Sequence, residues 1–169
     1  MQFMIKAIIV DDERHCIDRL QELIGRHARE TVAIKGVFDT VESGAGGLRE
    51  LRPDLVFLDV QIGNKTGFDL LQATKDIPCA VIFTTAYDQY AIQAFKFSAI
   101  DYLLKPVVAE DLLLAIDKMS RRVSETERSR KLENLLFNLT EASHKRIAVP
   151  VETGLLFIQV SDVRSEEHV

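Results

Sequence analysis

The chain has 169 residues, of which 47% are hydrophobic and 28% charged, and its formal net charge is -5. This composition is typical of a soluble globular protein, and it argues against a strongly nucleic-acid-binding or membrane-binding surface. The longest apolar runs have only the length of strands, so no transmembrane helix is expected. Two cysteines, Cys16 and Cys79, lie far apart in no metal-like spacing. They are predicted to be reduced thiols of a cytoplasmic protein.

Along the first 123 residues, apolar runs of strand length alternate with segments of helical periodicity. The alternation predicts a parallel sheet covered by helices on both faces, in an α/β fold. With five strands, the flavodoxin-like, doubly wound order 2-1-3-4-5 is favoured. Asp88 is a candidate N-cap of the fourth helix. The predicted strands are 6–10, 32–38, 54–58, 79–85 and 99–104, and the predicted helices are 13–27, 40–51, 67–74, 88–97 and 109–123.

After residue 123, the alternation of strand-length and helical segments ends. Residues 124–144 are charged and carry a second apolar cluster, which predicts a helical linker. A coiled coil is disfavoured there because the heptads break at Thr126 and Arg130. Residues 146–163 read as two strands around a turn at 152–154. A lone hairpin is only marginally stable in water, so this one either docks on other residues or begins a larger unit.

Polar side chains follow the predicted strands at the point where each ends. Asp11 and Asp12 follow the first strand, Asp59 follows the third, Thr85 ends the fourth, and Lys105 follows the fifth. In this topology the carboxyl ends of the parallel strands share one edge, where ligands bind at the switch point. We therefore expect these residues to converge, although 94 positions separate the first from the last.

Three neighbouring carboxylates repel one another, and at least one pKa would rise unless a cation were present. Mg²⁺ suits such a group because it takes oxygen ligands and keeps waters that a phosphate displaces. An aspartate is also a usable phosphoryl acceptor. Positioning and charge neutralisation are what phosphoryl transfer requires, and a lysine and a threonine hydroxyl add to both.

Each of these residues also has an ordinary structural interpretation. Asp11 and Asp12 are suitable caps for the following helix, and Asp59 is suitable for a turn at the strand end. Thr85 is a good strand former, and an isolated Lys105 would be solvated. The specific signal is that all of them fall on strand ends of one topology.

Four motifs, "IIVDDE", "LVFLDVQ", "FTTAYD" and "DYLLKP", together make the chain resemble the receiver (CheY-like) domain of bacterial two-component response regulators. The resemblance covers residues 5–123, and the receiver domain is expected to span 1–123. It implies that Asp59 is the phosphoacceptor for a sensor histidine kinase. It also implies a site for Mg²⁺, which Asp12 and Asp59 would bind directly, Asp11 largely through water, and Gln61 through its main-chain carbonyl.

The same resemblance gives roles to further residues. Thr85 would be the switch hydroxyl, Tyr102 the switch aromatic and Lys105 the phosphoryl contact, with a cis peptide before Pro106. The face made by helix 88–97, strand 99–104 and helix 109–123 would mediate homodimerisation after phosphorylation. Neither Gln61 nor the residue two positions after Thr85 is an acidic base, which predicts slow self-dephosphorylation.

Residues 83–106 are also similar to receivers that precede a LytTR-type DNA-binding domain. Residues 145–169 resemble the opening strands of that domain, with 124–144 as the linker. A complete LytTR domain is several times longer, so we expect DNA binding to require a region absent from this chain. The intact regulator would act on transcription in the cytoplasm, without a membrane anchor.

The chain departs from the family pattern after "LDVQ". Many relatives carry Met-Pro at this point, whereas this chain has Ile62 and Gly63. Because Gly63 lacks the restricted φ of proline, we expect a more mobile loop over residues 62–66.

Two alternatives to a phosphorylation switch remain at this point. A Mg²⁺-dependent phosphatase of the haloacid dehalogenase type would use a similar nucleophile, but it would need a second aspartate where this chain has Gln61. A receiver that is never phosphorylated would act only as a protein-interaction module. The complete set of acidic, Thr and Lys positions argues against the second alternative. We therefore expect a signalling protein and no conventional enzyme.

Overall fold

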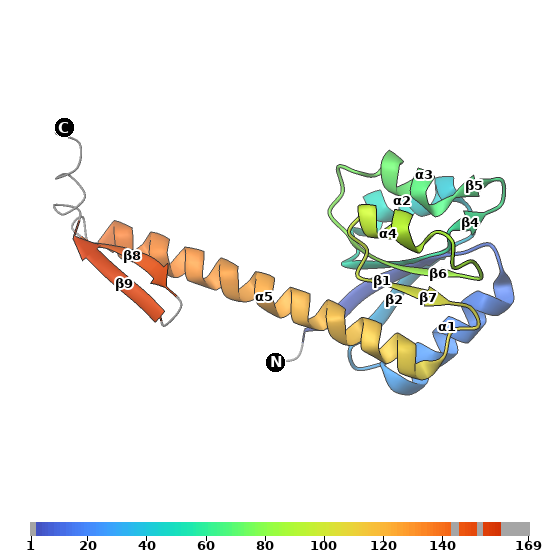
Figure 1. The fold of residues 1–169 in the computed structure, drawn as a ribbon, viewed down its shortest axis with the longest axis horizontal. Helices are drawn as coiled ribbons and strands as arrows, with labels where there is room; N and C mark the ends of the chain where they lie inside the picture. The colour runs from blue at the N-terminus through green and yellow to red at the C-terminus, as the bar shows by residue number, and fades with distance from the viewer. Residues whose placement is uncertain (1–2, 143–145, 152–153, 160–169) are drawn as a thin grey trace. The chain divides into compact units, whose positions relative to one another are not determined.

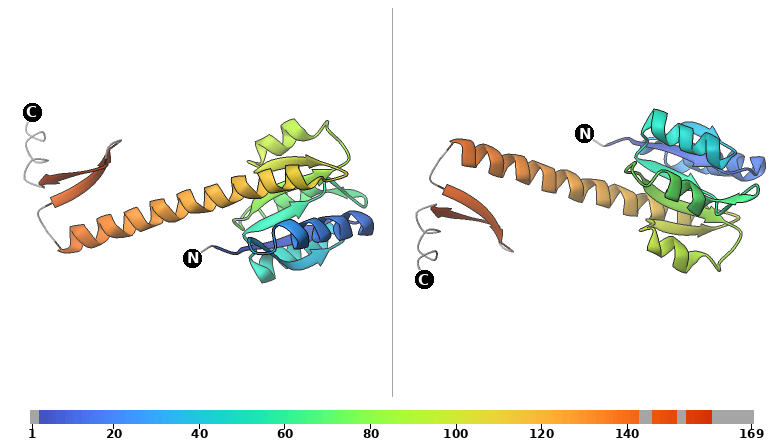
Figure 2. Two further views of the ribbon diagram at one scale, coloured as in Figure 1. Left: turned by 90° about the horizontal axis from the view of Figure 1, so that it is seen from below. Right: turned by 90° about the horizontal axis from the view of Figure 1, so that it is seen from above.

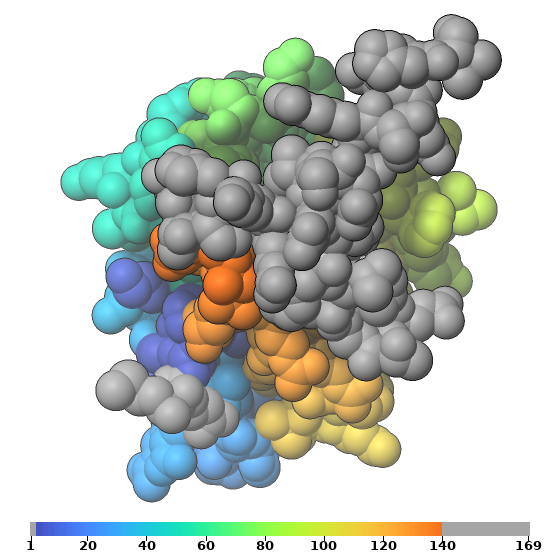
Figure 3. All heavy atoms as spheres, turned by 90° about the vertical axis from the view of Figure 1, so that its left-hand side faces the viewer, coloured from blue at the N-terminus to red at the C-terminus, as the bar shows by residue number. Residues whose placement is uncertain are grey.

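The computed structural model describes the main chain of residues 3–142, 146–151 and 154–159, and side chains as far as residue 139. Figure 3 shows in colour the atoms of the residues whose side chains are described. The chain divides into two compact units, Met1–Ser120 and Arg121–Val169. Each unit is described by itself.

The first unit is built on one five-stranded parallel sheet with the order β2-β1-β3-β6-β7. Counted along these five strands, this is the order 2-1-3-4-5, so the predicted flavodoxin-like fold is confirmed. The five strands are β1 (Ile5–Val10), β2 (Val32–Phe38), β3 (Leu55–Leu58), β6 (Ala80–Thr85) and β7 (Asp101–Leu104).

Helices cover both faces of this sheet (Figures 1 and 2). One face carries α2, α3 and α4, and the other carries α1 and the first turns of α5. Thr40 and Thr66 cap α2 and α3, each through a reciprocal pair of bonds with the third helical residue. Such capping boxes satisfy main-chain donors that the first turn leaves unpaired. The helices are α1 (Arg14–His27), α2 (Val41–Leu51), α3 (Gly67–Ala73), α4 (Ala91–Lys96) and α5 (Ala109–Ala142).

The hydrophobic core lies on both faces of the central strands of the sheet. All four residues of β3 are fully buried, so this strand is apolar on both faces. Val56 and Leu58 belong to the cluster that packs under α2 and α3, together with Leu48 and Leu70. The intervening Phe57 points to the opposite face because side chains alternate along a strand. The buried sheet supplies a rigid base for the residues that follow it.

The fourth helix is shorter than predicted. It begins at Ala91 rather than at residue 88, and Tyr90 occupies the N-cap position without a side-chain bond. The prediction that Asp88 caps this helix is therefore wrong. The main-chain carbonyl of Asp88 accepts the N–H of Ala91 at 3.3 Å, so Asp88 lies in a turn that precedes the helix.

Residues 61–66 form a short hairpin of β4 (Gln61–Ile62) and β5 (Lys65–Thr66). The mobility expected for residues 62–66 stays a prediction. The two central residues of the hairpin are Gly63 and Asn64, and Gly63 has a φ of 60°. A glycine in the first central position is what a type II′ hairpin turn favours. The Gly-Asn pair in the sequence is thus a hairpin signal.

The second unit contains the rest of α5 and an antiparallel hairpin. This hairpin pairs β8 (Arg146–Val151) with β9 (Gly154–Gln159). The predicted linker, 124–144, is helical as far as Ala142 and belongs to the same helix as residues 109–123. The predicted turn residues 152–153 and the end of the predicted second strand, 160–163, lie outside the described residues. Within the described part, no helix combines the length and the apolarity needed to cross a bilayer.

Candidate functional site

The site residues leave the sheet at the carboxyl ends of its strands. Asp11 follows β1, Asp59 follows β3 and Lys105 follows β7. Main-chain bonds extend the sheet up to these positions: the N–H of Asp59 donates to the carbonyl of Val10 at 3.0 Å, and that of Lys105 donates to the carbonyl of Thr85 at 2.8 Å. The backbone under each functional side chain is therefore held in place by its neighbouring strand.

Lys105 is the centre of the arrangement. Its Nζ atom lies 2.8 Å from Oδ2 of Asp11, 2.8 Å from Oδ2 of Asp59 and 3.1 Å from Oε1 of Glu13. The side chains are 9% exposed for Lys105 and 4% for each aspartate. Two buried carboxylates thus share one buried ammonium, which leaves an excess of negative charge.

Burial and the neighbouring charges shift the pKa values of Asp59 and Lys105 in opposite directions. Burial raises the pKa of Asp59 from 3.8 to about 6, the charge of Asp11 adds to this rise, and the bond from Lys105 opposes it. Burial would lower the pKa of Lys105, but its bonds to Asp11 and Asp59 outweigh that effect and raise it above its usual range. The lysine therefore stays charged near neutral pH.

Main-chain donors from the β4–β5 hairpin reach the same site. The N–H of Gly63 donates to Oδ2 of Asp12 at 2.9 Å, and the N–H of Gln61 donates to Oδ1 of Asp59 at 3.3 Å. The Gln61 main chain thus lies against Asp59, and the ligand role expected for its carbonyl stays a prediction. The Gln61 side chain points elsewhere, because its Nε2 donates to the Tyr90 hydroxyl at 3.3 Å.

The carboxylates form a set that fits a hard divalent cation. One oxygen from each of Asp11, Asp12, Glu13 and Asp59 lies within 4.8 Å of the others. Oxygen-only ligands at the edge of a sheet are what Mg²⁺ binds. Glu13 was missed as a member of this set, although it directly follows the two aspartates in "VDDE".

The two predicted switch residues meet at the main chain of Tyr87. The fully buried Thr85 accepts the N–H of Tyr87 on its hydroxyl at 3.3 Å. The Tyr102 hydroxyl donates to the carbonyl of the same residue. The Tyr102 ring packs against Phe83 with ring centroids 6.2 Å apart. The peptide bond between Lys105 and Pro106 is cis, as the resemblance implied.

A doubly wound sheet with a lysine and clustered aspartates at its strand ends defines a receiver-type signalling domain. The comparison with protein families agrees, because residues 7–117 match the response regulator receiver domain. The chain belongs to this family.

Curated relatives extend the similarity beyond the receiver. The chain is 36% identical over 163 residues to a sensory transduction protein LytT of Bacillus cereus and 32% identical over 165 residues to that of Bacillus subtilis. It is also 33% identical over 161 residues to the transcriptional regulatory protein BtsR of Salmonella typhi. Each alignment covers 95% of this chain and 64% of the relative, so the chain spans less than two thirds of their length.

Solved structures show the same fold. The response regulatory domain of mrkE from Klebsiella pneumoniae is 30% identical with a TM-score of 0.64, and the match covers 71% of this chain and 98% of that one. The receiver domain of AraT from Geobacillus stearothermophilus has a TM-score of 0.67 at 23% identity, covering 74% and 99% of the two chains.

Proposed function

We propose that this chain is a phosphorylation switch, in which Asp59 accepts a phosphoryl group from the phosphohistidine of a sensor histidine kinase. The single observation that carries the proposal is the placement of Lys105 Nζ at 2.8 Å from both Asp59 and Asp11. A carboxylate nucleophile, a buried cation and further oxygen ligands are together what phosphoryl transfer to aspartate needs. The proposal makes the protein a signalling component with no turnover of an external substrate.

In the transfer step, one carboxylate oxygen of Asp59 forms a bond to phosphorus. The bond between phosphorus and the donor's imidazole nitrogen breaks, and that nitrogen keeps the electron pair and takes up a proton. Lys105 faces the acceptor carboxylate and offers its positive charge to the new phosphoryl oxygens. When bound, Mg²⁺ would supply further positive charge at this site, held by Asp11, Asp12 and Asp59, with the Gln61 carbonyl as a proposed additional ligand. Burial of Asp59 limits competing access of water.

The proposed output is a shift between two conformations. The added oxygens would draw the Thr85 hydroxyl inward, which breaks its bond with the Tyr87 N–H. Because Tyr102 bonds the carbonyl of the same residue, its ring would be released to turn toward the interior. A phosphoryl group shifts this equilibrium only by the amount that it stabilises one state over the other.

Incubation with Mg²⁺ and acetyl phosphate or a phosphoramidate should add the mass of one phosphoryl group to the intact chain. Asp59→Asn should remove this labelling, because an amide is not a comparable nucleophile. Intact mass spectrometry measures both. The label should also be lost slowly, since neither Gln61 nor Tyr87 supplies an acidic base beside the acceptor.

Asp54→Asn is the matched control. Asp54 directly precedes β3 at the end opposite Asp59, where its carboxylate accepts the N–H of Lys6 at 2.8 Å. This variant should be labelled as well as the parent. Equal labelling of Asp59→Asn and the parent would show that the acceptor is a different residue.

A second part of the proposal is dimerisation through the face formed by α4, β7 and the start of α5. Within the described part of the chain, large apolar side chains on and beside these elements are exposed. They are Ile92, Phe95, Leu104, Val108, Leu113 and Leu114. Exposed apolar patches of this kind mark interaction sites. The switch residue Tyr102 lies on β7, the strand of this face, which would link the face to the phosphoryl site.

Addition of BeF₃⁻ with Mg²⁺ should raise the molar mass toward that of a dimer in size-exclusion chromatography with light scattering. Phe95→Asp should prevent this rise, because it places a charge on a side chain that is 83% exposed in the single chain. A mass that is unchanged by BeF₃⁻ in the parent, despite bound Mg²⁺, would contradict the proposed dimer.

We also propose a transcriptional output for the intact regulator. The β8–β9 hairpin supports the interpretation of residues 145–169 as the first strands of a LytTR-type domain, with 124–144 as a helical linker after the receiver at 1–123. DNA binding would belong to the remainder of such a domain. Reduced Cys16 and Cys79 are compatible with the cytoplasm, where phosphotransfer from the kinase would take place.

A further inference from the structure

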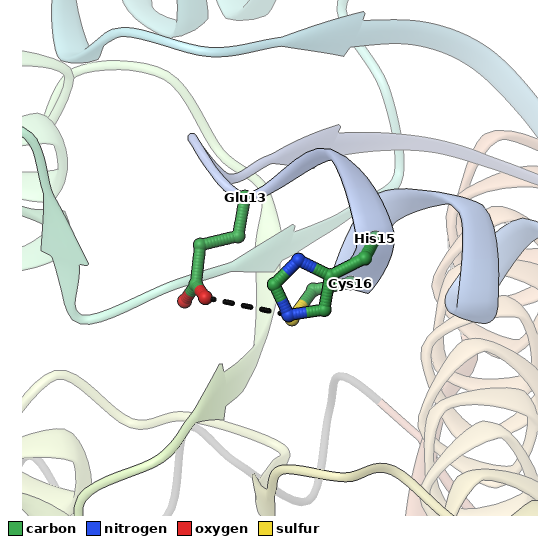
Figure 4. Close-up of side chains that lie close together, drawn as sticks. All are labelled: Glu13, His15 and Cys16. Atoms are coloured by element: carbon green, nitrogen blue, oxygen red, sulfur yellow. Dashed lines mark ion pairs between the residues drawn. The ribbon is translucent and has the colours of Figure 1, made fainter.

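A second group of potential metal ligands lies beside the carboxylate cluster, at the start of α1. It consists of Glu13, His15 and Cys16, which Figure 4 shows with their side chains close together. One ligand atom of each (a carboxylate oxygen, an imidazole nitrogen and a sulfur) lies within 4.8 Å of the other two. Sequence spacing alone gave no metal signal, because the thiol has no second cysteine near it. The first turn of the helix is what brings the three together.

The local backbone accounts for this convergence. Glu13 is the N-cap of α1, and its carbonyl accepts the N–H of Cys16 at 3.0 Å, which closes the first turn. His15 Nε2 lies 3.6 Å from Oε2 of Glu13. Two ligands of one tetrahedral zinc ion, each bound at ~2.0–2.1 Å, are separated by roughly 3.4 Å. The observed separation is therefore close to that required for both atoms to ligate one ion.

The chemistry of this group differs from that of the neighbouring cluster. Asp11, Asp12 and Asp59 offer only oxygen, which suits Mg²⁺. Nitrogen and sulfur ligands favour borderline or soft divalent ions, above all Zn²⁺.

There is also room for a further ligand. A cavity of about 300 Å³ adjoins the group, and Glu13, His15, Cys16 and Lys105 contribute to its lining. Zinc sites with three protein ligands keep a fourth position for water or another small ligand. The cavity gives room for such a ligand beside the three side chains.

We propose that Glu13 Oε2, His15 Nε2 and Cys16 Sγ bind a zinc-class divalent ion, with the fourth position open to the cavity. On binding, the Cys16 S–H bond breaks, the proton passes to solvent, and the sulfur donates its electron pair to the ion. No oxidation is involved.

Glu13 would then connect this ion with the phosphoryl site. Its Oε1 lies 3.1 Å from Lys105 Nζ, whereas its Oε2 faces His15. A metal on Oε2 draws electron density away from the carboxylate and weakens its hold on Lys105. The coupling rests on the proposed function, but the metal site itself does not.

Cobalt(II) is a suitable probe, because a thiolate ligand gives it a charge-transfer band in the near ultraviolet and tetrahedral ligation gives it strong visible bands. Reduced protein with excess Mg²⁺, which occupies the carboxylate cluster, should bind one Co²⁺ with both signals, and Zn²⁺ should displace it. Cys16→Ser should abolish the charge-transfer band. His15→Ala should weaken Zn²⁺ binding at least ~10-fold in calorimetry, as even the loss of an outer ligand contact does.

Cys79→Ser and His27→Ala are the matched controls, since neither residue belongs to the group, and both should bind as the parent does. Asp59→Asn should also keep the cobalt signals, so a failure of phosphorylation leaves this result standing. His15 is 80% exposed, so its replacement is compatible with folding. A cobalt complex without the thiolate band, or equal Zn²⁺ affinity of His15→Ala and the parent, would overturn the proposed site.

Discussion

Lys105→Met should lower the free energy of unfolding by about 3–5 kcal/mol at pH 7.5 in the absence of Mg²⁺. The reason is that Asp11 and Asp59, each only 4% exposed, lose the one ammonium that both contact. Removal of one partner from a buried charge cluster costs this much because the other partners are left without compensation. Methionine keeps most of the apolar stem, so the loss reports mainly on charge. Urea unfolding followed by circular dichroism measures it.

The sign of the pH dependence follows from Asp59. Its pKa in the folded protein, about 6, lies above its ordinary value of 3.8. The folded state therefore favours the protonated form, and this contribution to stability is lost as pH rises through about 6. Without Lys105 the pKa of Asp59 rises further. The variant should accordingly be closest to the parent near pH 5 and should fall behind it at higher pH.

Lys118→Met is the control for this prediction. Lys118 pairs with Asp101 at 2.9 Å, but its side chain is 57% exposed. An exposed pair of this kind contributes about 0–1 kcal/mol. Mg²⁺ should restore part of the stability of Lys105→Met and none of that of Lys118→Met. An equal loss for Lys105→Met at pH 5 and pH 7.5, unaffected by Mg²⁺, would show that the lysine acts through packing.

Gly67→Ala should destabilise the protein by about 2–3 kcal/mol and weaken Mg²⁺ binding. Gly67 is the first residue of α3, and its N–H donates to the carbonyl of Val60 at 2.8 Å. A Cβ atom there would lie 2.3 Å from the main-chain oxygen of Asp59 and 2.8 Å from Cγ of Leu58. Main-chain atoms cannot turn away as a flexible side chain does, so either α3 or the acceptor loop must move. Thermal unfolding and calorimetric titration with Mg²⁺ measure the two effects.

Gly46→Ala is the matched control, and it is expected to change the stability in the opposite direction. Gly46 lies inside α2, where a Cβ atom would meet nothing within 4 Å. Alanine is the better helix former by ~1 kcal/mol, so this variant should be slightly more stable than the parent. If Gly67→Ala also unfolded at or above the temperature of the parent, the close approach of α3 to Asp59 would be disproved.

The sheet was predictable because its strands are short apolar runs separated by helical segments. Burial on both faces makes β3 uniformly apolar, and this is the strongest local signal in the chain. The start of α4 was not predictable in the same way. Asp88 has a typical capping side chain, but the chain makes a further turn before the helix begins at Ala91. A sequence pattern identifies a suitable cap without showing whether the helix starts there.

The convergence of Asp11, Asp59 and Lys105 followed from topology, since strand ends in one parallel sheet share an edge. Three further features depend on the three-dimensional arrangement of the chain. Glu13 joins the site because the first turn of α1 points its carboxylate at Lys105. Gly63 contributes a main-chain N–H to Asp12, which side-chain chemistry cannot reveal. The grouping of His15 and Cys16 with Glu13 depends on rotamers within a single helical turn.

The three contacts of Lys105 have a consequence for how the switch operates. An ammonium carries three N–H donors, and here three carboxylate oxygens lie around it at 2.8, 2.8 and 3.1 Å. In the resting site, all three N–H donors of Lys105 are thus engaged. A new anionic oxygen can accept a hydrogen bond from Lys105 only if one of the carboxylates releases its own. On phosphorylation, the Lys105 ammonium would exchange a carboxylate partner for a phosphoryl oxygen, and the number of its hydrogen bonds would stay nearly constant. The driving force is therefore the difference in free energy between these two similar ion pairs. The exposed Glu13 is the partner most easily released, and it sets how readily the exchange occurs.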